Sequence, residues 1–206
     1  MTIEGGEGAG KSTQANLLVE SLKQFGIAAI STREPGGAPG AELIRRLLVE
    51  GEGDRWAPFT ETLLHIAARY EHILNTVRPA LEAGSWVVCD RFLDSTRAYQ
   101  GYGLGQNLSI IDQIHEIVLP GFMPDLTLLI DLDVKTGLDR TKLRGDQTGT
   151  RYEEMDIDFH QRVRKGFLDI AAGDPDRFVV LDGNNSVEDI ARQVVTSVGQ
   201  HFSLSF

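Results

Sequence analysis

The residues best suited to chemistry form a loop near the N-terminus, GGEGAGKS at positions 5–12. Their order matches the pattern G-x-x-x-x-G-K-[S/T], in which backbone N–H groups surround the phosphates of a nucleoside triphosphate. The glycines leave room for the backbone to turn around phosphate oxygens at the start of a helix. We therefore predict that Lys11 contacts the β- and γ-phosphates and that Ser12 binds Mg²⁺.

A second charged pair ends an apolar segment in the middle of the chain. Residues 86–90, WVVCD, have the composition of a buried strand, and Arg91 follows directly. Ligands of open α/β sheets collect at the carboxyl ends of the strands. We expect Asp90 to hold Mg²⁺ through water and Arg91 to bind a second phosphate group. The segment TREPGG at 32–37 indicates, by itself, only a sharp turn.

Short apolar segments alternate with longer segments of helical period, which predicts one α/β domain with a parallel sheet covered on both faces. The expected strands are residues 2–4, 28–32, 86–90, 126–132 and 178–181. The expected helices are residues 11–25, 40–49, 58–83, 110–119, 135–144, 158–172 and 187–198. A polar, irregular stretch at about 144–156 is expected to form a short lid. Only residues 2–4 precede the glycine loop, so we expect that the sequence begins a few residues late.

Length and composition narrow the class of protein. The 206 residues suit a single domain, and 30 acidic against 20 basic residues argue against neutralisation of nucleic-acid phosphates. The single cysteine, Cys89, stands in an apolar run, so we expect a buried thiol and a reducing compartment. No stretch approaches the roughly 20 apolar residues of a membrane span, and the N-terminus lacks a signal pattern. These features predict a soluble cytoplasmic protein without nucleic-acid or membrane partners.

Six segments together resemble the thymidylate kinases of the nucleoside monophosphate kinase group, over nearly the whole chain. They are EGGEGAGKST (4–13), TREPGG (32–37), AARYEH (67–72), DRFLDSTRAYQGYG (90–103), PDLTLLIDLDVKTGLDR (124–140) and RGDQTGTRYE (144–153). The resemblance implies a P-loop NTPase fold, with a five-stranded parallel sheet flanked by helices. It also implies phosphorylation of dTMP by ATP in dTTP synthesis, and a homodimer.

The resemblance assigns roles to single residues as well. Glu7 matches the acidic residue that contacts the 3′-hydroxyl of the sugar, Arg91 the arginine of the monophosphate, and Arg69 the arginine that hydrogen-bonds thymine. Thr96 and Tyr99 are expected to crowd the 2′ face of the sugar and to disfavour ribose. The expected substrate-binding residues are Glu7, Arg33, His65, Arg69, Arg91, Ser95, Thr96, Tyr99 and Gln100.

Phosphoryl transfer needs aligned phosphates and cations that face the transferred group, and it needs no general base. Members of the family place a catalytic basic residue either in the phosphate loop, where this chain has Gly8, or in the lid. We therefore predict a lid arginine, Arg151 as first choice and Arg144 as second. The expected catalytic residues are Lys11, Arg91 and Arg151, and the expected Mg²⁺ ligands are Ser12 and Asp90. The expected ATP-binding residues are Gly5, Gly6, Glu7, Gly8, Ala9, Gly10, Lys11, Ser12, Thr13 and Arg144.

One position departs from the family. An aromatic residue, usually Phe, stands four positions before the thymine-binding arginine, and this chain has His65 there. The two positions share a helix face. We hypothesise that His65 stacks on thymine and changes charge in the working pH range.

Two alternatives remain open at this point. One is a kinase for another nucleotide or nucleoside, and the other is a P-loop switch or partitioning ATPase. The sequence has no Asn-Lys-x-Asp guanine-reading motif, and the pair of Asp90 and Arg91 with a lid arginine suits an acceptor phosphate. Both observations weigh against the switch.

Overall fold

The computed structural model describes residues 1–50, 55–143 and 151–204. Its centre is a sheet of five parallel strands in the order β2-β3-β1-β4-β5. The strands are β1 (Thr2–Glu4), β2 (Ala29–Arg33), β3 (Trp86–Asp90), β4 (Thr127–Asp131) and β5 (Phe178–Asp182). The fold class and all five predicted strands are confirmed. The central strand β1 lies between β3 and β4, so the loop that follows it opens at the middle of the sheet edge.

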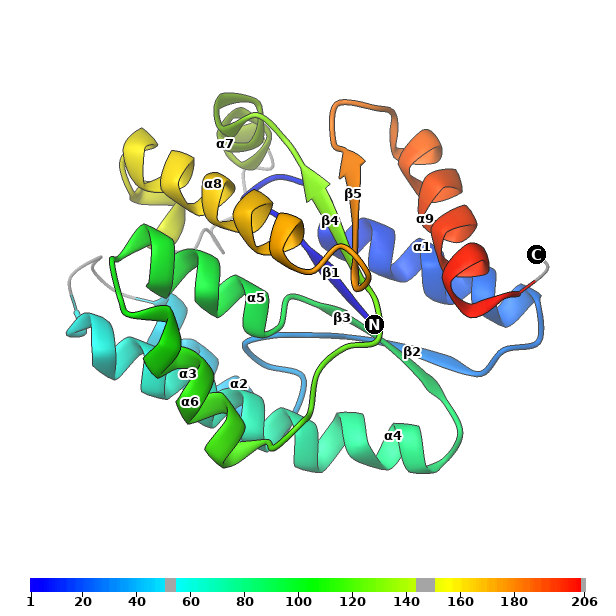
Figure 1. Cartoon of the computed structure of the whole chain (residues 1–206), viewed down its shortest axis with the longest axis horizontal. Coiled ribbons are helices and arrows are strands. Elements are labelled where there is room, and N and C mark those ends of the chain that lie inside the picture. Colours follow the sequence, from blue (N-terminus) through cyan, green and yellow to red (C-terminus); the bar gives the residue numbers. More distant parts are fainter. Residues whose placement is uncertain (51–54, 144–150, 205–206) are drawn as a thin grey trace.

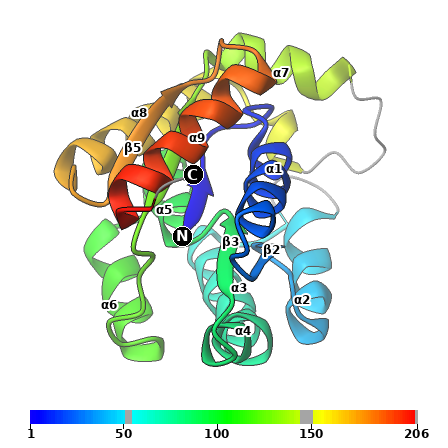
Figure 2. The ribbon, with the colours of Figure 1, turned by 90° about the vertical axis from the view of Figure 1, so that its right-hand side faces the viewer.

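Helices cover both faces of the sheet (Figure 1). One face carries α1 (Lys11–Gln24) and α9 (Val187–Phe202). The other carries α5 (Leu93–Thr96), its π-helical continuation η2 (Arg97–Gly103) and α8 (Ile157–Gly173). In the lower part of Figure 2 lie α2 (Pro39–Val49), α3 (Pro58–His72), α4 (Arg78–Glu82) and α6 (Leu108–Val118). The remaining elements are the π-helical turn η1 (Ile73–Val77), α7 (Val134–Leu143) and the 3₁₀ turn η3 (Arg151–Glu154).

Alternate side chains along each strand enter opposite cores, as the pleat of a strand requires. In β3, Val88 packs with α1 and α9, whereas Val87 packs toward η1 and α6. In β4, Leu128 enters the first core and Leu129 packs on the aromatic side chains of η2 and α8. Because both faces are buried, the strands read as continuous apolar runs in the sequence.

Two helical features differ from the prediction. The expected helix 58–83 contains the π-helical turn η1, and the helix formed by α5 and η2 was not predicted. The sequence LDSTRAYQGYG has little apolar periodicity and contains two glycines. Tertiary packing stabilises this helix. A Cβ on Gly103 would overlap the ring of Phe159, so η2 lies directly against α8. Contacts that are distant in sequence thus outweigh weak local propensity.

In the part of the chain that the structure describes, none of the helices combines the length and the apolar character needed to cross a membrane.

Candidate active site

A cavity of about 650 Å³ lies at the carboxyl ends of the strands and collects most of the predicted residues. Its walls come from the glycine loop, the end of β3 and the helices α3, η2, α7 and α9. The predicted residues that line it are Glu7, Gly8, Ala9, Gly10, Lys11, Ser12, Thr13, Arg33, His65, Arg69, Asp90, Arg91, Ser95, Thr96, Tyr99 and Gln100. Gly5, Gly6 and Arg151 do not line it, and Arg144 lies outside the described residues.

The glycine loop takes its shape from left-handed backbone and from a close helix contact. Gly8 has φ +69°, and a Cβ there would overlap the carbonyl oxygen of Gly137 at the start of α7. A larger residue at position 8 would therefore push α7 away from the loop. This explains why the loop of this chain carries no basic residue at that position.

Lys11 begins α1, and its Nζ donates to the carbonyl oxygen of Gly6 at 2.7 Å. Burial lowers the pKa of Lys11 to about 8, and the nearby Arg91 adds to this. A bound phosphate would favour the ammonium form, because its negative charge compensates for the lost hydration. The lysine is thus held at the loop where the sequence predicts phosphates.

Ser12 and Asp90 meet although 78 positions separate them in sequence. The hydroxyl of Ser12 donates to Oδ2 of Asp90, while the buried Oδ1 of Asp90 has no hydrogen-bond partner among the described residues. Hydroxyl and carboxylate oxygens are ligands that Mg²⁺ prefers. A buried carboxylate oxygen without a partner is costly, so this pair fits a divalent cation at the loop.

Arg91 is held in a strained backbone conformation, with φ +71°, directly after β3. Its guanidinium group donates to Glu7 at 3.0 Å, to the hydroxyl of Tyr99 at 3.1 Å and to Ser95 at 3.1 Å. Burial alone would raise the pKa of Glu7, but the charges of Arg91 and Lys11 outweigh it and lower that pKa to about 2. Glu7 is therefore ionised and pairs with the arginine that faces the cavity.

Two further arginines stand beside Arg91 at different depths. Arg33 is 55% exposed and paired with Glu42 at 3.0 Å, at the rim of the cavity. Arg45, which was not predicted, also lines the cavity and donates to the carbonyl oxygen of Pro35 at 2.7 Å. Among the described residues no carboxylate lies within ion-pair distance of Arg45. Its charge is thus better placed than that of Arg33 to bind an anion.

Arg69 of α3 also lines the cavity and is only 2% exposed. Its Nε donates to Glu34 at 2.7 Å, and its Nη2 donates to the hydroxyl of Thr96 at 2.9 Å. Glu34 is itself bound by Nδ1 of His72 at 3.0 Å. These contacts fix the guanidinium plane and leave Nη1 of Arg69 buried without a partner among the described residues.

Gln100 also lines the cavity and is fixed by side chains from two other elements. Its Nε2 donates to Glu61 of α3 at 2.8 Å and to the hydroxyl of Tyr152 in η3 at 3.1 Å. The buried Oε1 of Gln100 has no partner in the described part of the chain. Arg69 and Gln100 thus both line the cavity, and each has one buried polar atom without a partner among the described residues, a donor on Arg69 and an acceptor on Gln100.

His65 lines the cavity beside Arg69, but it does not titrate as hypothesised. Burial lowers the pKa of His65 to about 3, and the charges of Arg69 and Arg151 add to this. The imidazole is neutral throughout the range of about pH 5.5 to 8. The expectation of a charge change in the working range is wrong, because the surrounding protein and the neighbouring arginine charges disfavour the imidazolium cation.

The side chain of Arg151 is buried and contacts neighbouring residues. It donates to Glu61 and to the carbonyl oxygen of Leu48 at 2.7 Å, and its guanidinium lies 4.9 Å from the ring centre of Tyr152. Its side chain must leave Glu61 to reach a transferred phosphoryl group. The catalytic role of Arg151 stays a prediction, as does the role of Arg144.

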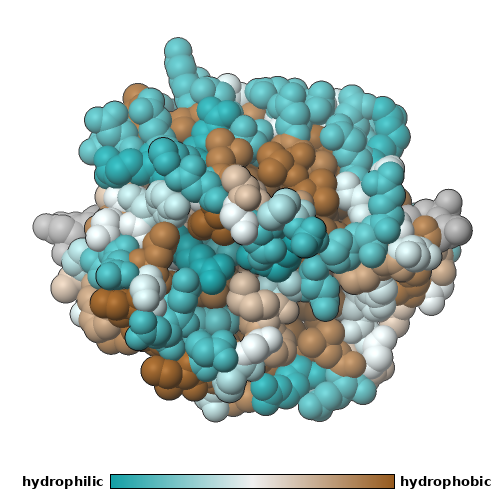
Figure 3. Space-filling model, in the orientation of Figure 1, coloured by the Kyte–Doolittle hydropathy of each residue, from teal (hydrophilic) through white to brown (hydrophobic). Residues whose placement is uncertain are grey.

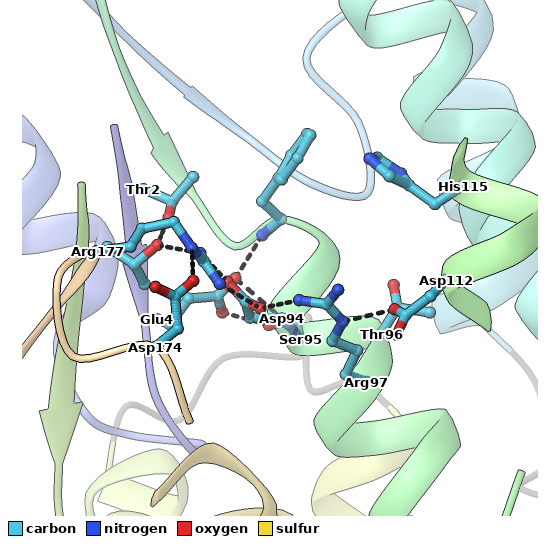
Figure 4. A network of polar contacts seen from close by, with 12 residues as sticks. Thr2, Glu4, Asp94, Ser95, Thr96, Arg97, Asp112, His115, Asp174 and Arg177 are labelled. Carbon is cyan, nitrogen blue, oxygen red and sulfur yellow. Dashed lines mark hydrogen bonds and ion pairs between the residues drawn. The ribbon is translucent and has the colours of Figure 1, made fainter. Parts of the chain in front are cut away.

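The helix that carries Thr96, Tyr99 and Gln100 is anchored at its start by a buried polar network (Figure 4). Asp94 is fully buried and pairs with Arg97 at 2.8 Å and with Arg177, from the loop before β5, at 2.6 Å. Glu4 at the end of β1 accepts from the backbone N–H of Phe92 at 2.7 Å and from the hydroxyl of Ser95 at 2.6 Å. The helix is thus tied to the end of the central strand β1 and to the segment that leads into β5.

Sequence reasoning missed several residues of this cavity. Glu34 lies within the TREPGG segment, and Tyr152 directly follows the predicted Arg151, so both stand in segments that the resemblance had marked. Arg45 lies on a helix face with no distinguishing local pattern, and so does Glu61, which does not line the cavity but accepts a hydrogen bond from Gln100. At the far end the cavity is lined by Arg140 and Thr141 of α7 and by Asn185, Ser186, Val187 and Ile190 around the start of α9.

Comparison with known proteins identifies the family of the chain. The family model described as thymidylate kinase matches residues 3–194. A thymidylate kinase of Ruegeria pomeroyi is 48% identical over 98% of this chain and 95% of its own length. A thymidylate kinase of Caulobacter vibrioides is 48% identical over 99% of this chain and 97% of its own. The crystal structure of a thymidylate kinase from Ehrlichia chaffeensis superimposes with a TM-score of 0.76 at 36% identity, over 96% of each chain. The chain belongs to the thymidylate kinase family.

Proposed function

We propose that this protein transfers the γ-phosphoryl group of ATP to dTMP within the described cavity and so makes dTDP for dTTP synthesis. The observation that carries the proposal is the continuity of this cavity. It joins a triphosphate-binding loop to a buried pocket with polar atoms suited to a pyrimidine base. The two substrates can therefore meet with their phosphates between Lys11 and Arg91.

ATP binds with its phosphates on the glycine loop, where the start of α1 and Lys11 supply positive potential. The nucleoside of ATP extends toward Arg140, Thr141 and the start of α9, because the other end of the cavity is occupied by the acceptor. Ser12 and Asp90 hold Mg²⁺, which supplies positive charge to the phosphate oxygens when it is bound.

dTMP binds on the other side of the loop. Arg91 and Arg45 contact its phosphate, with Arg33 at the rim, and Glu7 contacts the 3′-hydroxyl of the sugar. Thr96 and Tyr99 lie where a 2′-hydroxyl would need space. Thymine lies next to Arg69 and Gln100, and His65 stacks on its ring.

Catalysis follows from alignment and charge. Arg91 is fixed by three side chains, so it can hold the acceptor phosphate in line without reorganising during the reaction. Lys11 faces the transferred group from the loop, and a lid arginine, Arg151 in our assignment, completes the positive surroundings. Closure of the lid would also exclude water as a competing acceptor.

The protein is further proposed to work as a cytoplasmic homodimer. Large apolar side chains are exposed along α2, α3 and α6, namely Leu43, Leu47, Phe59, Leu63, Tyr70, Ile110 and Ile117. Apolar surface is visible at the lower left of Figure 3, over the region of α3 and α6 in Figure 1. Apolar patches of this kind are typical of subunit interfaces. Sedimentation should give a mass near twice 22.7 kDa, and Leu63→Glu should shift it to the monomer, while Leu168→Glu on α8 should not.

The reaction is tested by measuring ADP formation in a coupled assay with dTMP, dUMP, dCMP, dGMP and UMP as acceptors. We expect dTMP to give the highest kcat/KM, and omission of dTMP to abolish turnover. ATP hydrolysis that is unaffected by dTMP would contradict the proposal and favour a nucleotide-dependent switch. A higher kcat/KM for another monophosphate would instead revise the acceptor.

A further inference from the structure

Two side chains that line the cavity, Arg69 and Gln100, each have a hydrogen-bonding atom without a partner in the described part of the chain. Nη1 of Arg69 is a donor and Oε1 of Gln100 is an acceptor, and both are buried without partners among the described residues. Thymine presents a carbonyl oxygen beside a ring N–H, whereas cytosine presents an amino group beside a bare ring nitrogen. This donor and this acceptor match the carbonyl oxygen and the N–H of thymine, and they oppose both groups of cytosine. The match holds only while the amide of Gln100 keeps its oxygen toward the base.

A side-chain amide can rotate by 180°, which exchanges the positions of its oxygen and nitrogen atoms. A contact must therefore hold the amide of Gln100 in one orientation. Nε2 of Gln100 lies 2.8 Å from Oε1 of Glu61. A carboxylate only accepts hydrogen bonds, so a turned amide would place two oxygens in contact at a site that is 1% exposed. Tyr152 adds to the restraint, because its hydroxyl proton is already donated to Glu61 at 2.6 Å. The hydroxyl can therefore only accept from Gln100.

Glu61 is itself held in place by an oppositely charged side chain. Nη2 of Arg151 donates to its Oε2, so an opposite charge accompanies the buried carboxylate. Removal of either partner of such a pair is strongly destabilising, because the remaining charge would be buried without compensation. No substrate atom needs to touch Glu61, since its effect reaches the base through Gln100.

We propose that Glu61 is a specificity-determining positioning residue, which selects thymine over cytosine by holding the amide nitrogen of Gln100. The proposal rests on the proposed function, because it presumes dTMP in this pocket. It assigns to α3 a further role in base recognition, besides those of His65 and Arg69.

The test compares kcat/KM for dTMP and for 5-methyl-dCMP, which keeps the methyl group of thymine and reverses both hydrogen-bonding positions. In Glu61→Gln, an amide replaces the carboxylate and can pair with either orientation of Gln100. We expect the ratio of the two kcat/KM values to fall by about tenfold or more, since a site built to pair a polar group strongly rejects the mismatched analogue. Glu71→Gln makes the same change on the same helix, outside the cavity lining, and should leave the ratio unchanged.

A swap variant, Glu61→Gln with Gln100→Glu, separates base selection from the ion pair with Arg151. Both it and the single variant lose that ion pair, but a carboxylate at position 100 presents an acceptor whichever way it turns. We expect the swap to recover the preference for dTMP. A ratio that is unchanged in folded Glu61→Gln, or that falls equally in the swap, overturns the proposal. If Glu61→Gln does not fold, the swap decides, and its loss of preference for dTMP overturns the proposal. Wild-type turnover with dTMP in the same assay reports separately on the proposed function.

Discussion

The imidazole Nε2 of His65 lies 3.1 Å from the hydroxyl oxygen of Tyr152, so α3 and η3 contribute adjoining side chains to one wall of the cavity. The two ring centres are 6.4 Å apart and the planes are tilted by 37°. Tyr152 orients the histidine ring and is itself held by Glu61. The residue that replaces the usual phenylalanine is therefore fixed by a polar contact that phenylalanine cannot make.

His65→Phe tests the contact with thymine. A benzene ring should stack more strongly than imidazole, and such contacts are worth about 0.5–1.5 kcal/mol beyond burial. We expect a KM for dTMP that is several-fold lower and a KM for ATP that is nearly unchanged. Initial-rate kinetics measure both, with the exposed His201→Phe as a control. An unchanged KM for dTMP would show that position 65 does not touch the base.

The pH dependence of dTMP affinity should not change in His65→Phe between about pH 5.5 and 8, because the pKa of His65 is about 3.

The direction in which the free energy of unfolding changes with pH follows from the same pKa shift. The folded state lowers this pKa below its ordinary value of 6.5, so the stability contribution is complete above pH 6.5 and is lost as the pH falls toward 3. Denaturant unfolding should therefore show a smaller loss of stability over this acidic range in His65→Phe than in the wild type.

Arg151→Ala should affect both the reaction and the fold. If the arginine faces the transferred group after lid closure, kcat should fall roughly a hundredfold, which corresponds to ~3 kcal/mol, with small changes in either KM. The variant also leaves Glu61 buried without this partner, a loss that typically costs about 3–5 kcal/mol. Adding Glu61→Gln should recover stability but not kcat. Recovery of both, measured at a temperature where each variant is folded, would mean that Arg151 is structural only.

Lys11→Ala should abolish phosphoryl transfer without unfolding the protein. The Nζ of Lys11 contacts only the carbonyl oxygen of Gly6 among the hydrogen bonds described for it, and the fold does not depend on that contact. Circular dichroism should show a wild-type melting curve while ADP formation is lost. Lys23→Ala, at the exposed end of the same helix, should keep full activity. Near-normal turnover in folded Lys11→Ala would remove the phosphate-loop assignment.

Glu4→Gln should change how stability depends on pH. Burial, with the nearby charge of Asp94, raises the pKa of Glu4 to about 8, although Ser95 and Phe92 donate to it. A folded-state pKa above the ordinary 4.5 means that its stability contribution is complete below pH 4.5 and is lost as the pH rises through 8. Glutamine mimics the protonated form, so the variant should lose less stability between about pH 4.5 and 8. A wild-type slope in denaturant titrations of Glu4→Gln would contradict this.

The chemistry of the loop could be predicted from the sequence because the motif is local. Eight consecutive residues carry the phosphate-binding backbone, and the flanking strand and helix are recognisable from their own apolar periods. The same holds for Asp90 and Arg91, which end an apolar strand and must lie at the sheet edge where the loop opens. Parallel strands with both faces buried left a clear pattern, so the sheet was predictable to within about one residue at each end.

Only the tertiary structure determines which partner each charged side chain has. Glu61 meets Gln100 and Tyr152 across 39 and 91 positions, and no local pattern marks such a pair. Burial, which depends on the whole fold, made His65 neutral, and packing of η2 on α8 made a helix from a sequence with weak helical period. The sequence by itself determined where phosphates bind, because backbone geometry there follows from residue type. The orientation of the base-reading groups was decided by long-range contacts, because a side-chain amide or guanidinium takes its direction from its partners.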